Sequence, residues 1–358
     1  VHERLALVGV NAGYQPFVSS NGMLVLAAVG EIYNWKEVES LIFADTGKHF
    51  VGRSDSEVII GLYECYGTQG LQQMQGMFAF VLYDKERDSI FIARDPLGII
   101  PLYQGYDSQG QLWIATEMKC LVGVCDQIEV FPPGTYLGGQ IPSQKYVEYY
   151  APEWRNVIPK CEVDVSEFQR RFAYQVESHL PSGNKVAVLL SGGLDSSLIA
   201  SIAQRILKKV GRELVTYSIG LAGSPDLQYA RKVAEHIGSE HVEMIYTLEQ
   251  GIDSIKEMIW HLESYDVTTI RAGIPMYLLA RRVKKDGFRC ILSGEGSDEI
   301  FGGYLYFHQA PSAEEFHRET VSRVMNISYA DCLRANKATM AWGVEARVPF
   351  LSTMFVDY

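Results

Sequence analysis

The sequence has few cysteines, and none lies at the spacing of a metal site or a redox pair. Six cysteines occur in 358 residues, and no two of them form a C-x-x-C pair. A disulfide scaffold or a cysteine zinc site needs closely spaced or paired cysteines, so both classes are excluded. We therefore expect a reduced, cytoplasmic protein. The cysteines are scattered along the chain at Cys65, Cys120, Cys125, Cys161, Cys290 and Cys332.

Positive charge and long apolar runs are also scarce. The 32 Lys and Arg residues are outnumbered by 43 Asp and Glu, which gives a net charge of −11, and no basic run interleaves with aromatic residues. Nucleic acid and anionic membrane surfaces are therefore excluded as expected partners. No apolar stretch reaches the 18 residues that suggest a membrane-spanning helix. No signal peptide is recognisable. The chain begins at Val1 instead of methionine, so we expect an N-terminal segment to be missing.

The length predicts two domains, because 358 residues is long for one. A segment rich in Gly, Gln, Ser and Tyr ends near residue 150, and prolines follow it. We therefore place the first domain at 1–150, a linker at 151–165 and the second domain at 166–358.

The first domain shows many short β-rich segments separated by Gly, Asp and Asn. Helical spacing of apolar residues is limited and is best developed over 55–65. This pattern predicts an α+β domain built on antiparallel sheets. The expected strands cover 24–29, 77–83, 89–93 and 112–115.

The second domain alternates helical patterns with short apolar runs, which predicts an α/β fold with a parallel sheet. Ligands of such sheets bind beyond the carboxyl ends of the strands. Three conspicuous segments follow predicted strands, at 191–197, 220–226 and 293–299, so we expect them to share one edge of the sheet. The expected strands cover 186–190, 214–219, 241–245 and 288–292, and the expected helices cover 166–179, 226–237, 248–261 and 272–285.

The segment S-G-G-L-D-S-S at 191–197 lies between a buried strand and an amphipathic helix. Ser191, Gly192, Gly193 and Ser196 can surround an anion with N–H and hydroxyl donors. Asp195 could hold Mg²⁺ against bound phosphates. The alternative is an ordinary turn and helix cap. The segment is not a Walker A loop, and it resembles the pyrophosphate loop of ATP pyrophosphatases, which cleave ATP between its α and β phosphates.

The segment S-G-E-G-S-D-E at 293–299 places two carboxylates three residues apart. Asp298 is a candidate second metal ligand beside Asp195. Glu295 is a candidate general base that takes a proton from an attacking amine. The alternative is that Ser297 or Asp298 only caps a helix.

The first half resembles the glutaminase half of glutamine-dependent asparagine synthetase at HERL (2–5), GEIYN (30–34), SDSE (54–57), GMFAF (76–80) and RDPLG (94–98). This resemblance implies an N-terminal nucleophile fold. It also implies a glutamine pocket, for which a guanidinium and carboxylates are suitable partners. The implied pocket residues are Arg4, Leu5, Ala6, Leu7, Val8, Gly30, Glu31 and Asp55. The alternative is that Arg4, Glu31 and Asp55 are paired surface charges.

Two departures from that family concern glutamine hydrolysis. Val1 has no nucleophilic side chain, and the segment with the family's N-terminal cysteine is not present. Val29 stands where the family has an asparagine that helps to form the oxyanion hole. One such donor contributes about 10²–10³ in turnover. We therefore expect this chain to hydrolyse glutamine poorly or not at all.

The second half is similar to the synthetase half of bacterial-type asparagine synthetase B at YDVTTIR (265–271), LSGEGSDE (292–299), FGGY (301–304) and GVEARVPFL (343–351). By matching position, the loop 191–196 would hold pyrophosphate, and Glu295 would act in forming and resolving β-aspartyl-adenylate. Ser352 departs from the family's usual aspartate, and the chain ends at Tyr358 before the family's C-terminal helices. The resemblance assigns Leu189, Ile219, Ser293 and Gly294 to the nucleotide, and Thr268, Thr269, Arg271 and Arg347 to orienting aspartate and phosphate.

These observations lead to one main hypothesis and two rivals. The main hypothesis is an ATP- and Mg²⁺-dependent synthetase that converts aspartate to asparagine with ammonia, which the family normally takes from glutamine. One rival is a related adenylating enzyme, similar to β-lactam synthetase, whose glutaminase half is inert. The other is a nucleotide-binding protein without turnover. Dimers are common in the resembling family, so a homodimer is one expectation.

Overall fold

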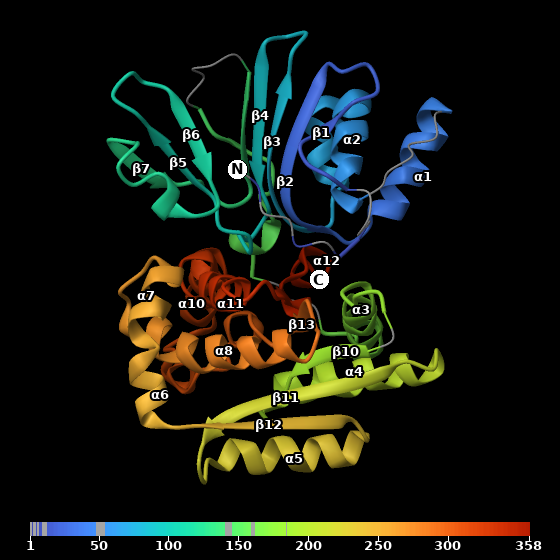
Figure 1. The fold of residues 1–358 in the computed structure, drawn as a ribbon. Coiled ribbons are helices and arrows are strands. Elements are labelled where there is room, and N and C mark those ends of the chain that lie inside the picture. Colours follow the sequence, from blue (N-terminus) through green and yellow to red (C-terminus); the bar gives the residue numbers. More distant parts are fainter. Residues whose placement is uncertain are drawn as a thin grey trace. The chain divides into compact units, whose positions relative to one another are not determined.

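The computed structural model describes residues 2, 5, 7–8, 13–47, 54–139, 145–158, 162–183 and 185–358. The chain divides into two compact units, Val1–Arg155 and Asn156–Tyr358 (Figure 1). The division lies inside the segment that the sequence suggested as a linker. Within the described part of the chain, no helix is both long and apolar enough to cross a membrane.

The first unit contains two antiparallel sheets, which confirms the predicted sheet type. The larger sheet has the order β1-β2-β3-β4-β8-β9, and the smaller has the order β6-β5-β7. The larger sheet consists of β1 (Phe17–Val18), β2 (Leu24–Ile32), β3 (Gly76–Asp84), β4 (Ser89–Arg94), β8 (Thr135–Gly139) and β9 (Val147–Glu148). The smaller consists of β5 (Tyr103–Tyr106), β6 (Leu112–Ala115) and β7 (Gln127–Val130).

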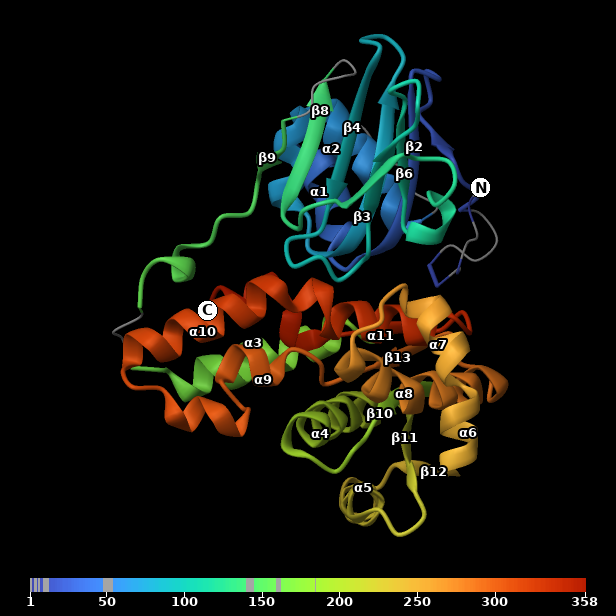
Figure 2. The ribbon, with the colours of Figure 1, turned by 90° about the vertical axis from the view of Figure 1, so that its left-hand side faces the viewer.

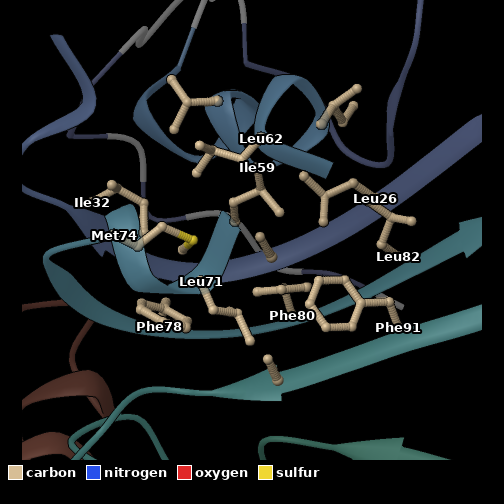
Figure 3. Close-up of a cluster of buried hydrophobic side chains, with 14 of the residues drawn as sticks. Leu26, Ile32, Ile59, Leu62, Leu71, Met74, Phe78, Phe80, Leu82 and Phe91 are labelled. Atoms are coloured by element: carbon tan, nitrogen blue, oxygen red, sulfur yellow. The ribbon is translucent and has the colours of Figure 1, made fainter. Parts of the chain in front are cut away.

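Two α-helices, α1 (Trp35–Thr46) and α2 (Val58–Tyr66), accompany the larger sheet. Alternate residues of β2 and β3, including Leu26 and Phe80, face Ile59 and Leu62 of α2 in one apolar core (Figure 3). The sequence predicted α2 as part of 55–65 but missed α1, in which only Val38 and Ile42 are buried. Short 3₁₀ helices cover Asp55–Glu57, Gly67–Gln73, Met118–Cys120 and Glu153–Arg155.

The second unit is built on a five-stranded, entirely parallel sheet of order β12-β11-β10-β13-β14, which confirms the α/β prediction. The fifth strand, β14, was not predicted. The strands are β10 (Lys185–Leu189), β11 (Glu213–Leu221), β12 (Glu240–Tyr246), β13 (Cys290–Leu292) and β14 (Glu345–Arg347).

Helices cover both faces of this sheet (Figure 2). Val186 and Val188 of β10 point into a core with α3, α4 and α5, whereas Ala187 points into a core with α8. The α-helices are α3 (Val165–Ser178), α4 (Leu194–Lys209), α5 (Pro225–Ile237), α6 (Leu248–Asp253), α7 (Ile255–Leu262), α8 (Val267–Lys285), α9 (Ser297–Phe301), α10 (Ala313–Asn326), α11 (Asp331–Met340) and α12 (Thr353–Val356). Short 3₁₀ helices cover Leu305–Gln309, Ile327–Tyr329 and Pro349–Leu351.

Two predicted helices differ from the structure. The helix expected at 248–261 is divided at Ser254 into α6 and α7. The helix expected at 272–285 begins five residues earlier, at Val267, because the Asp266 side chain accepts a hydrogen bond from the Thr269 N–H at 2.7 Å. That cap satisfies one of the N–H groups at the helix start and extends the helix into the segment 267–271.

Candidate active site at the carboxyl edge of the parallel sheet

The segments that follow β10 and β13 meet at the carboxyl edge of the sheet. β10 is central and pairs with β11 on one side and β13 on the other. The Ser297 hydroxyl donates a hydrogen bond to Asp195 Oδ1 at 2.7 Å, although 102 residues separate the two in sequence. A Cβ built on Gly294 would lie 3.3 Å from the Ser196 nitrogen. Of the three segments predicted to share one edge, 191–197 and 293–299 are therefore confirmed to do so, and 220–226 lies at the end of β11, the parallel neighbour of β10.

The loop after β10 has a shape that only a glycine allows at its second residue. Gly192 has a φ of +84°, and a Cβ there would lie 2.5 Å from the backbone nitrogen of Ala230 at the neighbouring helix α5. Ser191 stabilises the loop through its hydroxyl, which accepts a hydrogen bond from the Gly193 N–H at 3.2 Å and lies 3.0 Å from Ser196 Oγ. Gly193 precedes α4 and supplies no side-chain cap. The N–H groups at the start of α4 are thus not capped by that residue.

Asp195 and Asp298 lie on the same side of the fold. Burial, followed by the nearby charges of Asp195 and Asp331, raises the pKa of Asp298. A Cβ on Gly303 would lie 2.0 Å from Asp298 Oδ1, so a side chain at 303 would displace the Asp298 carboxylate. The adenylation hypothesis requires Asp195 and Asp298 at the same edge of the sheet, and the structure places them there. Their binding of a metal ion remains a prediction.

Glu295 belongs to a chain of ion pairs that the sequence did not reveal. Its Oε2 lies 2.7 Å from Arg334 Nη2, and Arg334 Nη1 lies 2.7 Å from Asp331 Oδ1. Burial raises the pKa of Glu295, Arg334 acts against this rise, and the charges of Asp331 and Glu299 add to it. Asp331 and Arg334 come from α11, and their i,i+3 spacing is the only local sign of the pair.

The residues predicted for the nucleotide lie at the ends of three adjacent strands. Leu189 ends β10, Ile219 lies near the end of β11, and both pack against the same core. Ser293 directly follows β13, is buried, and donates its N–H to the Arg347 carbonyl at 2.9 Å. Gly294 follows it and contacts the loop after β10. The structure thus brings the four together, and their contact with a nucleotide remains a prediction.

The residues predicted to orient aspartate and phosphate have two different environments. Thr268 and Arg271 are exposed on the first turns of α8, whereas Thr269 is buried. Arg347 is 4% exposed, and its guanidinium donates to Glu345 Oε1 at 2.8 Å and to the His179 carbonyl at 3.1 Å. These contacts hold β14 within the core. They favour a structural role for Arg347 over contact with a substrate.

The first unit brings together three of the residues predicted to bind glutamine. Asp55 Oδ2 accepts a hydrogen bond from the Ile32 N–H at 2.9 Å, which places Asp55 beside Gly30 and Glu31 at the end of β2. Glu31 and Asp55 are buried, so their interpretation as surface charges is wrong. Leu5, Leu7 and Val8 are half-buried, and Arg4 and Ala6 lie outside the described residues.

Comparison with known proteins gives the same division of the chain. Residues 167–315 and 309–358 match the family described as asparagine synthase, and residues 1–142 match the glutamine amidotransferase domain. Asparagine synthetase B [glutamine-hydrolyzing] of Escherichia coli is 48% identical over 99% of this chain and 66% of its own length. A probable asparagine synthetase of Schizosaccharomyces pombe is 48% identical over 99% of this chain and 67% of its length. Asparagine synthetase 1 of Saccharomyces cerevisiae is 46% identical over the whole chain and 67% of its length.

The chain thus spans about two thirds of the length of these curated relatives. The asparagine synthase match covers more than half of the chain and includes both segments that meet at the carboxyl edge of the sheet. The chain belongs to the asparagine synthase family.

Proposed function

We propose that this chain is an ATP-dependent ligase that forms asparagine from aspartate and ammonia through a β-aspartyl-adenylate. The observation that carries the proposal is the hydrogen bond from Ser297, the neighbour of Asp298, to Asp195 beside a glycine loop, at the edge of a parallel sheet where ligands bind. The relatives are named glutamine-hydrolyzing asparagine synthetases, which agrees with this chemistry.

The loop after β10 is the proposed pyrophosphate site. Its backbone N–H groups and the start of α4 offer hydrogen-bond donors and the positive end of the helix dipole to an anion. Ser191 and Gly193 are exposed, so a ligand can reach them. Leu189 and Ile219 provide apolar contacts at the adjoining strand ends for the adenine nucleotide.

The donor set at this edge fits a magnesium ion. Asp195 and Asp298 are the residues that would hold it, and proteins commonly bind Mg²⁺ through one or two carboxylates together with substrate phosphates. Among the residues that the structure describes, no group of three His, Cys, Asp or Glu side chains converges as a self-sufficient metal site. Two aspartates that need phosphate oxygens to complete the coordination agree with that finding. Bound Mg²⁺ would neutralise the charge of the leaving pyrophosphate.

The chemistry requires two displacements. The side-chain carboxylate of aspartate attacks the α-phosphorus of ATP, and pyrophosphate leaves. Ammonia then attacks the activated carbonyl, AMP leaves with the electrons of the broken bond, and the nitrogen loses a proton. Glu295 is the proposed acceptor of that proton. Arg334 Nη2 donates a hydrogen bond to Glu295 Oε2 at 2.7 Å, and Oε1 is the oxygen that we assign to the proton transfer.

The proposal is tested by incubating the chain with ATP, Mg²⁺, ammonium and aspartate. We expect pyrophosphate and asparagine in equal amounts. Glu295→Ala should abolish asparagine formation and leave ATP binding within a few-fold of wild type. Pyrophosphate release only with another carboxylic acid would favour the β-lactam synthetase-like rival. ATP binding without pyrophosphate release from any acid would favour the rival without turnover.

Three further features belong to the same proposal. Glutamine is the nitrogen donor that the first unit implies. Because Val29 is expected to impair glutamine hydrolysis, free ammonia is the proposed nitrogen donor for this chain. The scattered cysteines favour a reducing, cytoplasmic location. A homodimer is also proposed, and the mass measured by light scattering in solution tests it.

A further inference from the structure

Helix α11 presents three charged residues at intervals of three. Asp331, Arg334 and Lys337 lie on one face of this helix because residues three apart are neighbours on a helix surface. Arg334 pairs with Glu295 in the segment after β13, and Lys337 pairs with Glu263 at the end of α7 at 3.0 Å. One helix face therefore connects two segments that are far apart in sequence.

Arg334 reaches Glu295 by passing over a glycine of α8. A Cβ built on Gly273 would lie 3.6 Å from Arg334 Cγ, which is an ordinary van der Waals distance, so the arginine stem packs against α8 at this residue. The side chains of Arg334 and Glu295 are 12% and 17% exposed. Charges this well shielded from water interact more strongly than surface pairs, and the loss of one partner leaves the other without compensation.

From this geometry we infer that Arg334 is a positioning residue, which holds the Glu295 carboxylate at the sheet edge through one oxygen and leaves the other oxygen for the reaction. The inference rests on the proposed function. Two separate guanidinium nitrogens bind Glu295 and Asp331, at 2.7 Å each. Asp331 thereby fixes the direction of Arg334, as Arg334 fixes that of Glu295. A lysine in this place carries the charge but not the planar fork that bridges two carboxylates.

Arg334 also favours the ionised form of Glu295. The charged groups that act on this carboxylate are Arg334 and Asp331 on α11 and Glu299 on α9. Of these, Arg334 alone is positive. Without it, burial and two negative neighbours remain, and Glu295 binds its proton up to a higher pH. A carboxylate that is protonated at the working pH cannot accept a proton from the amine.

The test compares Arg334→Met, Arg334→Lys and Arg323→Gln in the full chain. Arg323 pairs with Glu319 on the exposed face of α10 and serves as the control. For Arg334→Met we expect at least a tenfold loss of kcat in ammonium-dependent asparagine formation, with the KM for ATP within twofold of wild type. The acidic limb of its pH–rate profile should move to higher pH. Arg334→Lys should restore the acidic limb while kcat stays below wild type, and Arg323→Gln should match wild type in both respects.

A wild-type kcat and pH profile in Arg334→Met would overturn the inference. So would a parallel loss of kcat, ATP affinity and thermal stability in both Arg334 variants with the acidic limb unmoved, because a merely structural residue behaves in that way. A wild-type chain that releases no pyrophosphate with aspartate would instead overturn the proposed function, and with it the role given to Glu295. Circular dichroism of each variant verifies that the fold compared is the same.

Discussion

A side chain at Gly192 would collide with the backbone of α5, whereas one at Gly193 would not. The nearest atom to a Cβ at 192 is a backbone nitrogen at 2.5 Å, and the φ of +84° is itself unfavourable for other residues. At 193 the nearest atom is the Ser191 hydroxyl at 3.3 Å, and φ is −71°. We expect Gly192→Ala to lower the free energy of unfolding by about 1–3 kcal/mol through backbone strain.

Gly193→Ala is the matched control and should change the unfolding free energy by less than about 1 kcal/mol. Urea unfolding of both variants beside wild type provides the measurement. Equal losses in the two variants would show that the collision at 192 is not what restricts the loop to glycine.

His179 should make the second unit less stable as the pH falls. It is 1% exposed, and burial together with the charge of Arg347 lowers its pKa from 6.5 to about 3. The folded form therefore excludes a proton that the unfolded chain accepts. The resulting stability is complete above pH 6.5 and is lost as the pH falls toward 3, by up to about 1.4 kcal/mol per pH unit.

Replacing His179 by glutamine removes this titration. We expect the unfolding free energy of His179→Gln to fall less than that of wild type between pH 7.5 and pH 5.0, by about 2 kcal/mol. His236→Gln serves as the control, because His236 is exposed on α5. Identical pH dependence in wild type and His179→Gln would contradict the assignment.

The residues of the candidate site were predictable from sequence where they lie in short loops that carry their own pattern. Asp195 and Asp298 follow strands that are apolar runs, so the parallel sheet brings them to one edge. Arg334 was not predictable in this way, because its partner Glu295 lies 39 residues away. No local spacing relates a loop glutamate to an arginine on a later helix.

Among the elements, α11 contributes both apolar and charged contacts to the second unit. Met258, Leu262, Ile274, Tyr277 and Ala338 join α7, α8 and α11 in one apolar cluster. Within this region Lys337 Nζ lies 3.0 Å from Glu263 Oε2, and the side chains are 2% and 3% exposed. The loss of one member of a buried ion pair leaves a buried charge and costs about 3–5 kcal/mol.

We therefore expect Lys337→Met to be strongly destabilising, and the double variant Lys337→Met/Glu263→Gln to recover part of the loss because it removes both charges of this pair together. Chemical unfolding of wild type, both single variants and the double variant completes the cycle. Additive losses in the double variant would contradict a direct coupling between the two residues.

The sequence predicted most strands and helices of the second unit, and the exceptions have identifiable physical causes. β14 consists of Glu345, Ala346 and Arg347, and it is too charged and too short to be recognised as a buried strand. Its burial is possible because Glu345 and Arg347 pair with each other at 2.8 Å. The early start of α8 depends on a cap from Asp266, which a search for apolar spacing does not detect.

At the scale of the whole molecule, the two units differ in the elements that supply their predicted site residues. In the second unit, residues from several strand ends converge on one edge of a parallel sheet. In the first unit, Asp55 and Glu31 are buried at the end of β2, and Gly30 fits there because a Cβ would lie 2.0 Å from the Met77 carbonyl oxygen. Gly30 is thus required by strand packing, whether or not glutamine binds beside it.

Because of Val29, we expect the first unit to hydrolyse glutamine poorly even if the second unit forms asparagine. Val29 precedes Gly30 in β2 and pairs with Ala79 of β3. A valine side chain has no hydrogen-bond donor, and the resemblance implies an asparagine of the oxyanion hole at this position. Loss of one such donor costs about 10²–10³ in turnover. We therefore expect the chain to form asparagine from ammonium at least a hundredfold faster than from glutamine.

This prediction is tested by measuring glutamate release from glutamine, and asparagine formation from each nitrogen donor, on one preparation of the protein. Equal rates with the two donors would show that the first unit supplies ammonia despite the valine, and would require another donor to stabilise the oxyanion.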